Sequence, residues 1–160
     1  MNKTKRKIFE TSMKLFAEKG YDATSIEEIT SVVGVAKGTL YYHFSSNEEI
    51  FHFLVDEGMK LLQNSISIKT AQKTNSIDKL KSIVLIQLKV LYKYEDFMTI
   101  IFSQLWGNEP RNIECKKYVV QYLKIIEEII QDGINKGEII KADSETIASE
   151  IFSTTCISLI

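Results

Sequence analysis

One stretch of the sequence gathers side chains that can hydrogen-bond to a nucleic acid. Residues 34–44 read GVAKGTLYYHF, which places a lysine, a threonine, two tyrosines and a histidine close together. If this stretch forms a helix, Leu40 and Phe44 share one face, because successive residues turn by about 100°. Gly38 and Tyr42 then point the opposite way. Packing onto a core explains the first pair, whereas the polar and aromatic face has no packing purpose and favours contact with DNA.

The residue types on that face suit the major groove, the only groove in which a helix reaches base edges. The glycine lets the backbone approach closely, and the threonine can bond a phosphate or touch a thymine methyl group. The tyrosines offer rings for apolar contact and hydroxyls for phosphate. Alternatively, the tyrosines only cover the edge of the core. The whole set favours DNA, and the predicted contacts are Lys37, Gly38, Thr39, Tyr41, Tyr42 and His43.

Two further helices are predicted before this one. The first covers residues 4–19, and the second begins at Thr24 or Ser25, because each of them lies three residues before a glutamate and so fits a capping box. A helix N-terminus carries free amides and suits a phosphate oxygen, so Thr24 and Ser25 join the candidate DNA contacts. That these caps serve only the helix fits equally well. Gly34 then allows a tight turn between two short helices.

Composition permits a helical protein with a substantial core, and the net charge does not by itself indicate the partner. The chain has 160 residues with 44% hydrophobic content, enough for a substantial core, and only one proline interrupts it. Its formal charge of -1 does not by itself indicate a nucleic-acid partner. The basic N-terminal cluster is either a solvated tail or, beside the turn and helix, a phosphate-facing patch, and it comprises Lys3, Lys5, Arg6 and Lys7.

Catalytic and metal sites are not predicted. The two cysteines lie far apart outside any CxxC pattern, and the two histidines, His43 and His52, form no nucleophile or ligand set. We therefore expect no enzyme, no cofactor and no metal. No signal peptide is recognisable, and no apolar run approaches a membrane span, so we expect a cytoplasmic protein.

Residues 6–49, RKIFETSMKLFAEKGYDATSIEEITSVVGVAKGTLYYHFSSNEE, resemble the DNA-binding domain of TetR-family transcriptional regulators. The matching motifs are LFAEKGYDATS, the GV turn and KGTLYYHF. The resemblance implies an all-α chain, with a three-helix helix-turn-helix domain at residues 1–46 and a helical effector-binding and dimerisation domain at 47–160. It also implies DNA contact by the six residues named above. Many members have serine and lysine where this sequence has Ala36 and Asn47, which removes two phosphate-binding groups.

Long apolar-striped helices are predicted in the second part of the chain. Their ranges are 47–68, 77–94, 96–106, 111–136 and 144 onward. The polar segment 69–76 is predicted to be a loop, and the helix at 96–106 is apolar nearly all round, so we expect it to be buried on most sides. The last helix stops inside an apolar run, from which we expect a truncated C-terminus that leaves residues uncovered, namely Phe152, Ile157, Leu159 and Ile160.

Aromatic and apolar side chains in the second part could line an effector pocket. Taken residue by residue, ordinary core is the better explanation of each, because an aromatic stripe at helical spacing needs no ligand. Few charges fall on the inner stripes, which favours an apolar or aromatic effector. The candidates are Tyr92, Phe97, Met98, Phe102, Trp106, Tyr118 and Tyr122.

The function predicted from these features is that of a homodimeric repressor, released from a palindromic double-stranded DNA operator by a small-molecule effector. The alternative is a helical DNA-binding protein without a small-molecule response, whose second domain only dimerises or binds a protein partner. The effector, the operator sequence and the regulated genes do not follow from the sequence.

Overall fold

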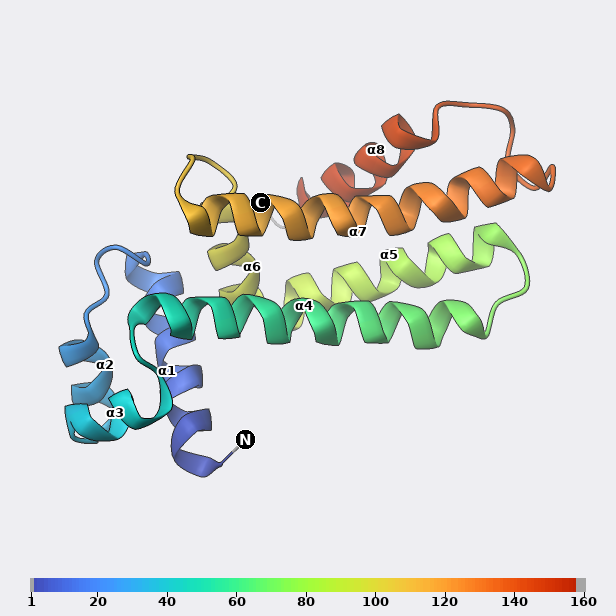
Figure 1. Ribbon diagram of the computed structural model, residues 1–160. Coiled ribbons are helices and arrows are strands. Elements are labelled where there is room, and N and C mark those ends of the chain that lie inside the picture. Colours follow the sequence, from blue (N-terminus) through green and yellow to red (C-terminus); the bar gives the residue numbers. More distant parts are fainter. Residues whose placement is uncertain (1, 158–160) are drawn as a thin grey trace. The chain divides into compact units, whose positions relative to one another are not determined.

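The computed structural model describes residues 2–157, with side chains up to Cys156, and helices are the only regular secondary structure in that range (Figure 1). The all-α prediction is therefore confirmed. The helices are α1 (Lys3–Lys19), α2 (Ile26–Val33), α3 (Lys37–His43), α4 (Asn47–Ala71), α5 (Ser76–Lys93), α6 (Glu95–Ser103), α7 (Pro110–Asn135) and α8 (Ser144–Ile157).

The helices form two compact units. Unit 1 combines Met1–Gly58 with Asp96–Cys115, and unit 2 combines Met59–Glu95 with Lys116–Ile160. Unit 1 thus holds α1 to α3 and α6 together with the first turns of α4 and α7. The predicted boundary between the DNA-binding and effector domains, after residue 46, stays a prediction. The boundaries between the two compact units fall elsewhere and include positions inside α4 and α7.

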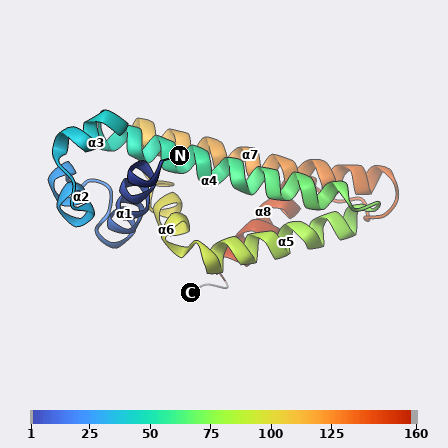
Figure 2. The same ribbon diagram turned by 90° about the horizontal axis from the view of Figure 1, so that it is seen from below.

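The three N-terminal helices of unit 1 pack on one another around an apolar and aromatic core (Figures 1 and 2). Within it the ring of Tyr21 lies 5.3 Å from the rings of both Phe16 and Phe51. Burial of such side chains is the main stabilisation of helices this short, which would not persist alone. The buried side chains from these helices and the start of α4 include Ile8, Leu15, Phe16, Ile29, Val33, Leu40, Phe44, Ile50, Phe51 and Leu54.

Local signals fix the start and end of α2. The hydroxyl oxygen of Ser25 accepts a hydrogen bond from the amide of Glu28 at 3.1 Å, so the N-cap of α2 is Ser25 and not Thr24. At the other end Gly34 has φ 77°, the left-handed conformation that favours glycine, and its amide donates to the carbonyl of Thr30. This turn reverses the chain and leads directly into α3.

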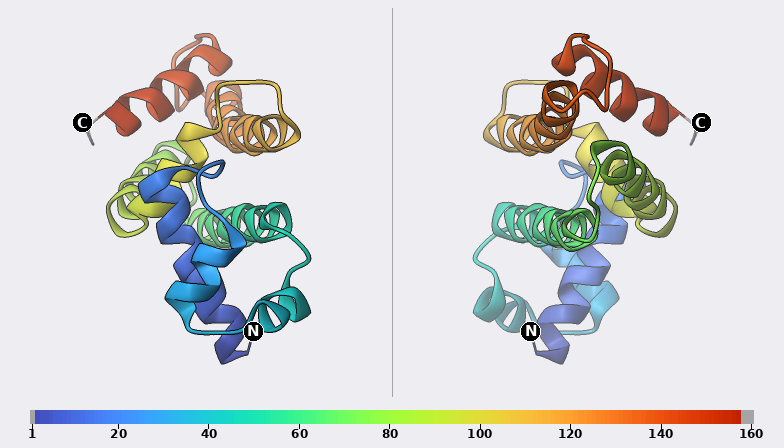
Figure 3. Two further views of the ribbon diagram at one scale, coloured as in Figure 1. Left: turned by 90° about the vertical axis from the view of Figure 1, so that its left-hand side faces the viewer. Right: turned by 90° about the vertical axis from the view of Figure 1, so that its right-hand side faces the viewer.

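Unit 2 is built from the later turns of α4 and α7 together with α5 and α8, and Figure 3 views it close to the axes of α5 and α7. Helix α8 packs on α5. The buried apolar side chains of this unit include Met59, Ile66, Ile83, Leu91, Ile126, Ile130 and Ala148.

Two predicted boundaries were wrong. Helix α4 continues through Lys69 to Ala71, because buried Ile66 anchors its last turns and none of residues 69–71 is a helix breaker. Helix α6 ends at Ser103, and only one face of it is buried. Apolar composition predicted burial all round, but Trp106 lies beyond the helix with 83% of its surface exposed.

Two further predictions concern membrane-spanning helices and the apolar C-terminus. Among the described helices, none combines the length and the apolar character that crossing a membrane requires. Of the four residues expected to be uncovered at the C-terminus, Phe152 is half-buried, with its ring 5.8 Å from that of Tyr122. The other three predictions concern Leu159, Ile160 and the side chain of Ile157, which lie outside the described residues.

Candidate nucleic-acid interface

Helix α3 separates its side chains into a buried and an exposed face, as its sequence predicts. Leu40 and Phe44 are fully buried, whereas Tyr42 is 84% exposed and Tyr41 is also exposed. Gly38 lies on the surface, and an added side chain there would meet nothing within 4 Å. The exposed face is therefore open to a partner while the buried face holds the helix in place.

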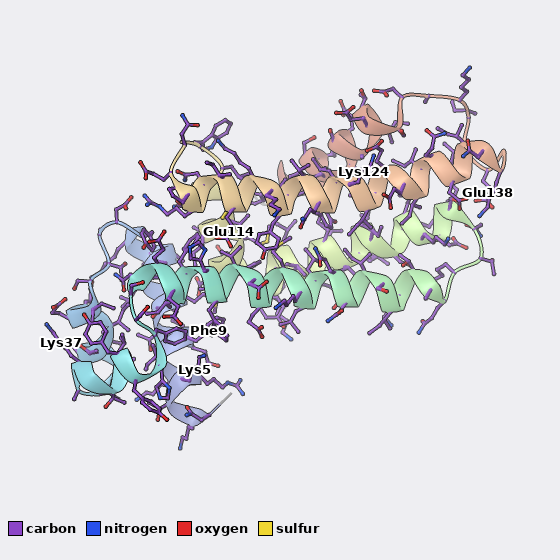
Figure 4. The ribbon with its side chains drawn as sticks, viewed as in Figure 1. Lys5, Phe9, Lys37, Glu114, Lys124 and Glu138 are labelled. Carbon is purple, nitrogen blue, oxygen red and sulfur yellow. The ribbon has the colours of Figure 1, made fainter. Side chains whose placement is uncertain are left out.

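Basic residues of α1 stabilise the helix-turn-helix unit itself. The ammonium group of Lys7 donates a hydrogen bond at 2.8 Å to the carbonyl of Val33, where the C-terminal end of α2 carries partial negative charge. The ammonium group of Lys5 lies over the rings of Phe44 and Phe53, at 4.8 and 4.4 Å from their centroids (Figure 4). Arg6 forms an ion pair with Glu10.

This placement corrects the first interpretation of the basic N-terminus, because α1 begins at Lys3 and the cluster is therefore no solvated tail. The phosphate-facing patch stays a prediction, and Lys5, Arg6 and Lys7 each also have a partner within the chain. The sequence shows the run of basic residues but not most of its partners, because Lys7 contacts α2 and Lys5 contacts Phe53 of α4.

Two lysines near the candidate interface form ion pairs with the first turn of α2. Lys37, the first residue of α3, pairs with Glu27, and Lys19 pairs with Glu28. The hydrogen bond between Lys37 and Glu27 raises the pKa of the lysine and lowers the pKa of the glutamate. Both groups are therefore charged at neutral pH, and the positive end of α3 is compensated in the free protein.

The two candidate contacts before α2 differ in accessibility. Thr24 is buried, and its hydroxyl donates to the carbonyl of Gly20 at 2.9 Å, so its side chain does not belong to the exposed surface. This corrects its inclusion among the side chains that reach DNA. Ser25 is exposed, and its hydroxyl keeps a proton to donate while its oxygen caps α2.

Asn47 has a structural role at the position where many family members carry lysine. Its side-chain amide donates at 2.6 Å to the carbonyl of Thr24 and so ties the start of α4 to the segment before α2. The N-terminus of α4 is closed by a capping box, in which Ser46 accepts from the amide of Glu49 while the carboxylate of Glu49 accepts from the amide and hydroxyl of Ser45.

Arg111 is a residue of unit 1 that sequence reasoning missed. Its guanidinium donates to both carboxylate oxygens of Asp22 at 2.9 Å and to the side-chain oxygen of Gln104 at 3.0 Å. It also stacks on Tyr21, 4.7 Å from the ring centroid, and its side chain is only 19% exposed. This group, the Arg111 cluster, holds the segment between α1 and α2 against the start of α7. The residues are 89 positions apart, so no local pattern announces the contact.

His52 links α4 to α7 within unit 1. One ring nitrogen contacts the carboxylate of Glu114, labelled in Figure 4, and the other lies 3.7 Å from that of Glu48. His43, the other histidine, is half-buried with its ring 5.0 Å from that of Tyr42. Among the described residues no group of histidine, cysteine and carboxylate side chains could hold a metal ion.

The predicted effector residues are divided between the units. Phe97, Met98, Phe102 and Trp106 belong to unit 1, and Tyr92, Tyr118 and Tyr122 belong to unit 2. Tyr92 is 88% exposed and, like Trp106, is a surface residue, which corrects its assignment to an enclosed lining. Phe97 packs where a side chain on Gly58 would collide with its ring, so it closes the contact between α4 and α6.

Tyr122 lies in a buried polar group of unit 2. Its hydroxyl donates at 2.8 Å to the side-chain oxygen of Gln87, whose amide nitrogen donates to the carbonyl of Phe152 at 3.2 Å and lies 3.5 Å from the sulfur of Cys156. Burial raises the pKa of the Tyr122 hydroxyl, so it remains protonated and acts as a donor. We call these four residues the Gln87 group.

The short second helix, the glycine turn and the exposed third helix define a helix-turn-helix protein. The family model described as bacterial regulatory proteins, tetR family, matches residues 8–54. A solved structure of a proposed fatty acid metabolism regulator from Clostridium perfringens is 35% identical, with a TM-score of 0.87 over 96% of this chain and 85% of that chain.

Two curated bacterial relatives agree with this likeness. The uncharacterized HTH-type transcriptional regulator YerO of Bacillus subtilis is 30% identical over 74% of this chain and 41% of its own length. The negative transcriptional regulator IcaR of the Staphylococcus aureus biofilm operon icaADBC is 38% identical over 71% of this chain and 59% of its own. The chain thus spans about half the length of these two relatives.

The chain belongs to the TetR family of bacterial regulatory proteins. Its relatives are regulators, which confirms the expectation that it is not an enzyme.

Proposed function

We propose that this protein is a DNA-binding transcriptional repressor whose α3 enters the major groove of an operator. The observation that carries the proposal is the exposed face of α3, held by the complete burial of Leu40 and Phe44. A helix fixed in this way can present side chains to base edges without ordering them first, which lowers the cost of binding. The proposed contacts are Ser25, Lys37, Gly38, Thr39, Tyr41, Tyr42 and His43.

Repression by a homodimer extends this proposal. IcaR is described as a negative regulator, which supports repression. Two copies related by a two-fold axis would place two α3 helices in successive major grooves of a palindromic site, about 34 Å apart. Exposed apolar side chains of unit 2 on α4, α5 and α7 support a further association, and they include Leu61, Leu85, Leu88 and Val120.

Release by a small molecule is the finer part of the proposal. We place the effector in unit 2, where the core is apolar and the Gln87 group offers one buried polar spot. Such a site suits a mainly apolar molecule with a single polar end. The description of the Clostridium perfringens protein as a fatty acid metabolism regulator agrees with an apolar effector.

The test is binding of the purified protein to the DNA upstream of its own gene and, in parallel, to sites selected by the protein from random duplexes. Fluorescence anisotropy at several salt concentrations gives Kd for each DNA. We expect sequence-specific binding whose affinity falls steeply with salt, because phosphate contacts release counterions. A protein that bound no selected or genomic sequence better than random DNA would overturn the proposal.

Two exposed tyrosines provide a matched pair for this test. Tyr42→Ala removes a proposed groove contact and is expected to weaken specific binding about tenfold, the size of one good base contact. Tyr92→Ala removes an equally exposed tyrosine of unit 2 and is expected to leave Kd unchanged. Equal losses in the two variants would contradict the assignment of α3 as the reading helix.

A further inference from the structure

The ion pair between Lys37 and Glu27 lies beside the proposed DNA-reading face. Lys37 is the first residue of α3 and is labelled in Figure 4, while Glu27 lies in the first turn of α2. The two side chains are 54% and 63% exposed, so no burial prevents their separation. A carboxylate offers a lysine the same chemistry as a phosphate oxygen, namely a negatively charged acceptor.

We propose that Glu27 competes with DNA phosphate for Lys37 and thereby lowers the affinity of this protein for every duplex. The inference rests on the proposed function. For Lys37 to bind a phosphate it must leave Glu27, and the carboxylate that stays behind then has no counter-charge next to the DNA. This cost is the same for an operator and for a random duplex, so Glu27 lowers both affinities and leaves their ratio, which the base contacts of α3 set, unchanged.

The neighbouring residue provides the internal comparison. Glu28 lies in the same helical turn and has the same charge, but it pairs with Lys19 at the end of α1. A loss of charge at either glutamate changes the net charge equally and removes one negative charge from the first turn of α2. Only the loss at Glu27 frees the lysine of α3, so a difference between the two variants reports the competition itself.

The experiment measures Kd for a selected operator and for a random duplex with the wild type, Glu27→Gln, Glu28→Gln, Lys37→Ala and the double variant Glu27→Gln/Lys37→Ala. We expect Glu27→Gln to tighten binding to both duplexes about two- to fivefold beyond Glu28→Gln, the range of an exposed ion pair. In the Lys37→Ala background the same substitution is expected to bring no gain. Thermal unfolding of each variant confirms that it is folded.

Each other outcome overturns the inference in a recognisable way. A gain from Glu27→Gln that persists without Lys37 assigns the effect to direct repulsion between the carboxylate and DNA. Equal gains in Glu27→Gln and Glu28→Gln assign it to net charge alone, and no gain in either shows that the ion pair costs the complex nothing. If the wild type binds no DNA, the proposed function itself has failed, which is a separate result.

Discussion

Each of the two units of this protein is stabilised internally by a different kind of contact. In unit 1, directional polar bonds join segments far apart in the chain, from Lys7 to the carbonyl of Val33 and from Arg111 to Asp22. Unit 2 depends mainly on apolar packing around residues such as Ile83 and Ile126. Its polar contacts between distant segments include the Gln87 group and the bond from the amide of Ser76 to the carboxylate of Glu138. Unit 2 also leaves many large apolar side chains on its surface.

This difference fits what each unit is proposed to do. Hydrogen bonds and ion pairs act at defined distances and angles, so they fix the orientation of α2 and α3 more narrowly than apolar contact does. Apolar cores accept alternative packings of similar volume before they lose stability. A unit that reads DNA needs the first property, and a unit that admits a small molecule gains from the second.

The largest expected effect concerns the core beneath α3. Leu40→Ala removes a fully buried side chain and is expected to destabilise unit 1 by about 2–5 kcal/mol, which would also abolish DNA binding. Leu91→Ala is the equivalent truncation in unit 2. Urea unfolding followed by amide hydrogen exchange assigns each loss to a unit. If either variant weakened protection equally throughout the chain, the two units would unfold as one.

The features of α3 that this prediction uses were accessible from the sequence. The spacing of Leu40 and Phe44 predicted the buried face of α3 correctly, because the period of a single helix determines which side chains share a face. The choice between Ser25 and Thr24 as the cap was not accessible, because both fit the same local pattern and only tertiary packing buries Thr24. Apolar character likewise misplaced Trp106, since composition does not say which side chains a neighbour covers.

The Arg111 cluster tests whether directional contacts matter in unit 1. Arg111→Ala removes the ion pair with Asp22, in which one guanidinium nitrogen contacts both carboxylate oxygens, together with the bond to Gln104 and a ring contact, and is expected to cost about 1.5–3 kcal/mol of unfolding free energy. Arg111→Lys should recover little, because one ammonium group cannot bond Asp22 and Gln104 together and stack on the ring of Tyr21 as a planar guanidinium does. The measurement is urea unfolding at low and moderate salt.

An exposed ion pair of unit 2 is the control for that experiment. Lys124, labelled in Figure 4, pairs with Glu127 at 3.0 Å on the surface of α7. Lys124→Ala is expected to leave the unfolding free energy almost unchanged, as usual for such exposed helix pairs. If Arg111→Ala lowered the unfolding free energy no more than Lys124→Ala does, the contrast between the two units would be lost.

A smaller loss is expected from the buried polar contact of unit 2. Tyr122→Phe leaves the side-chain oxygen of Gln87 without its donor, and is expected to cost about 1–2 kcal/mol. Adding Gln87→Met removes the unpaired acceptor and should restore part of that stability, because an apolar core accepts a side chain of similar volume. Urea unfolding of the two variants measures this. No recovery in the double variant would mean that Gln87 matters mainly through its bond to the carbonyl of Phe152.

The two cysteines allow each unit to be followed separately, because Cys115 lies in unit 1 and Cys156 in unit 2. Burial, with a smaller contribution from the neighbouring carboxylate of Glu114, raises the pKa of the Cys115 thiol to about 12. Burial also raises the pKa of Cys156, but the hydrogen bond from Gln87 opposes this. Iodoacetamide at pH 8 should therefore alkylate Cys156 first, as measured by mass spectrometry of timed samples. Equal rates in native protein would contradict the tight closure of unit 1.

A further expected effect is a dependence of the stability of unit 1 on alkaline pH. An unfolded cysteine ionises near pH 8.5, whereas folded Cys115 keeps its proton up to about pH 12. Between these values the unfolded state loses a proton that the folded state retains, so the unfolding free energy falls as pH rises. Below the lower value the contribution is constant. Cys115→Ala should flatten this slope in urea unfolding from pH 8 to 10, while Cys156→Ala should change it less, because only the former removes the more strongly shifted group.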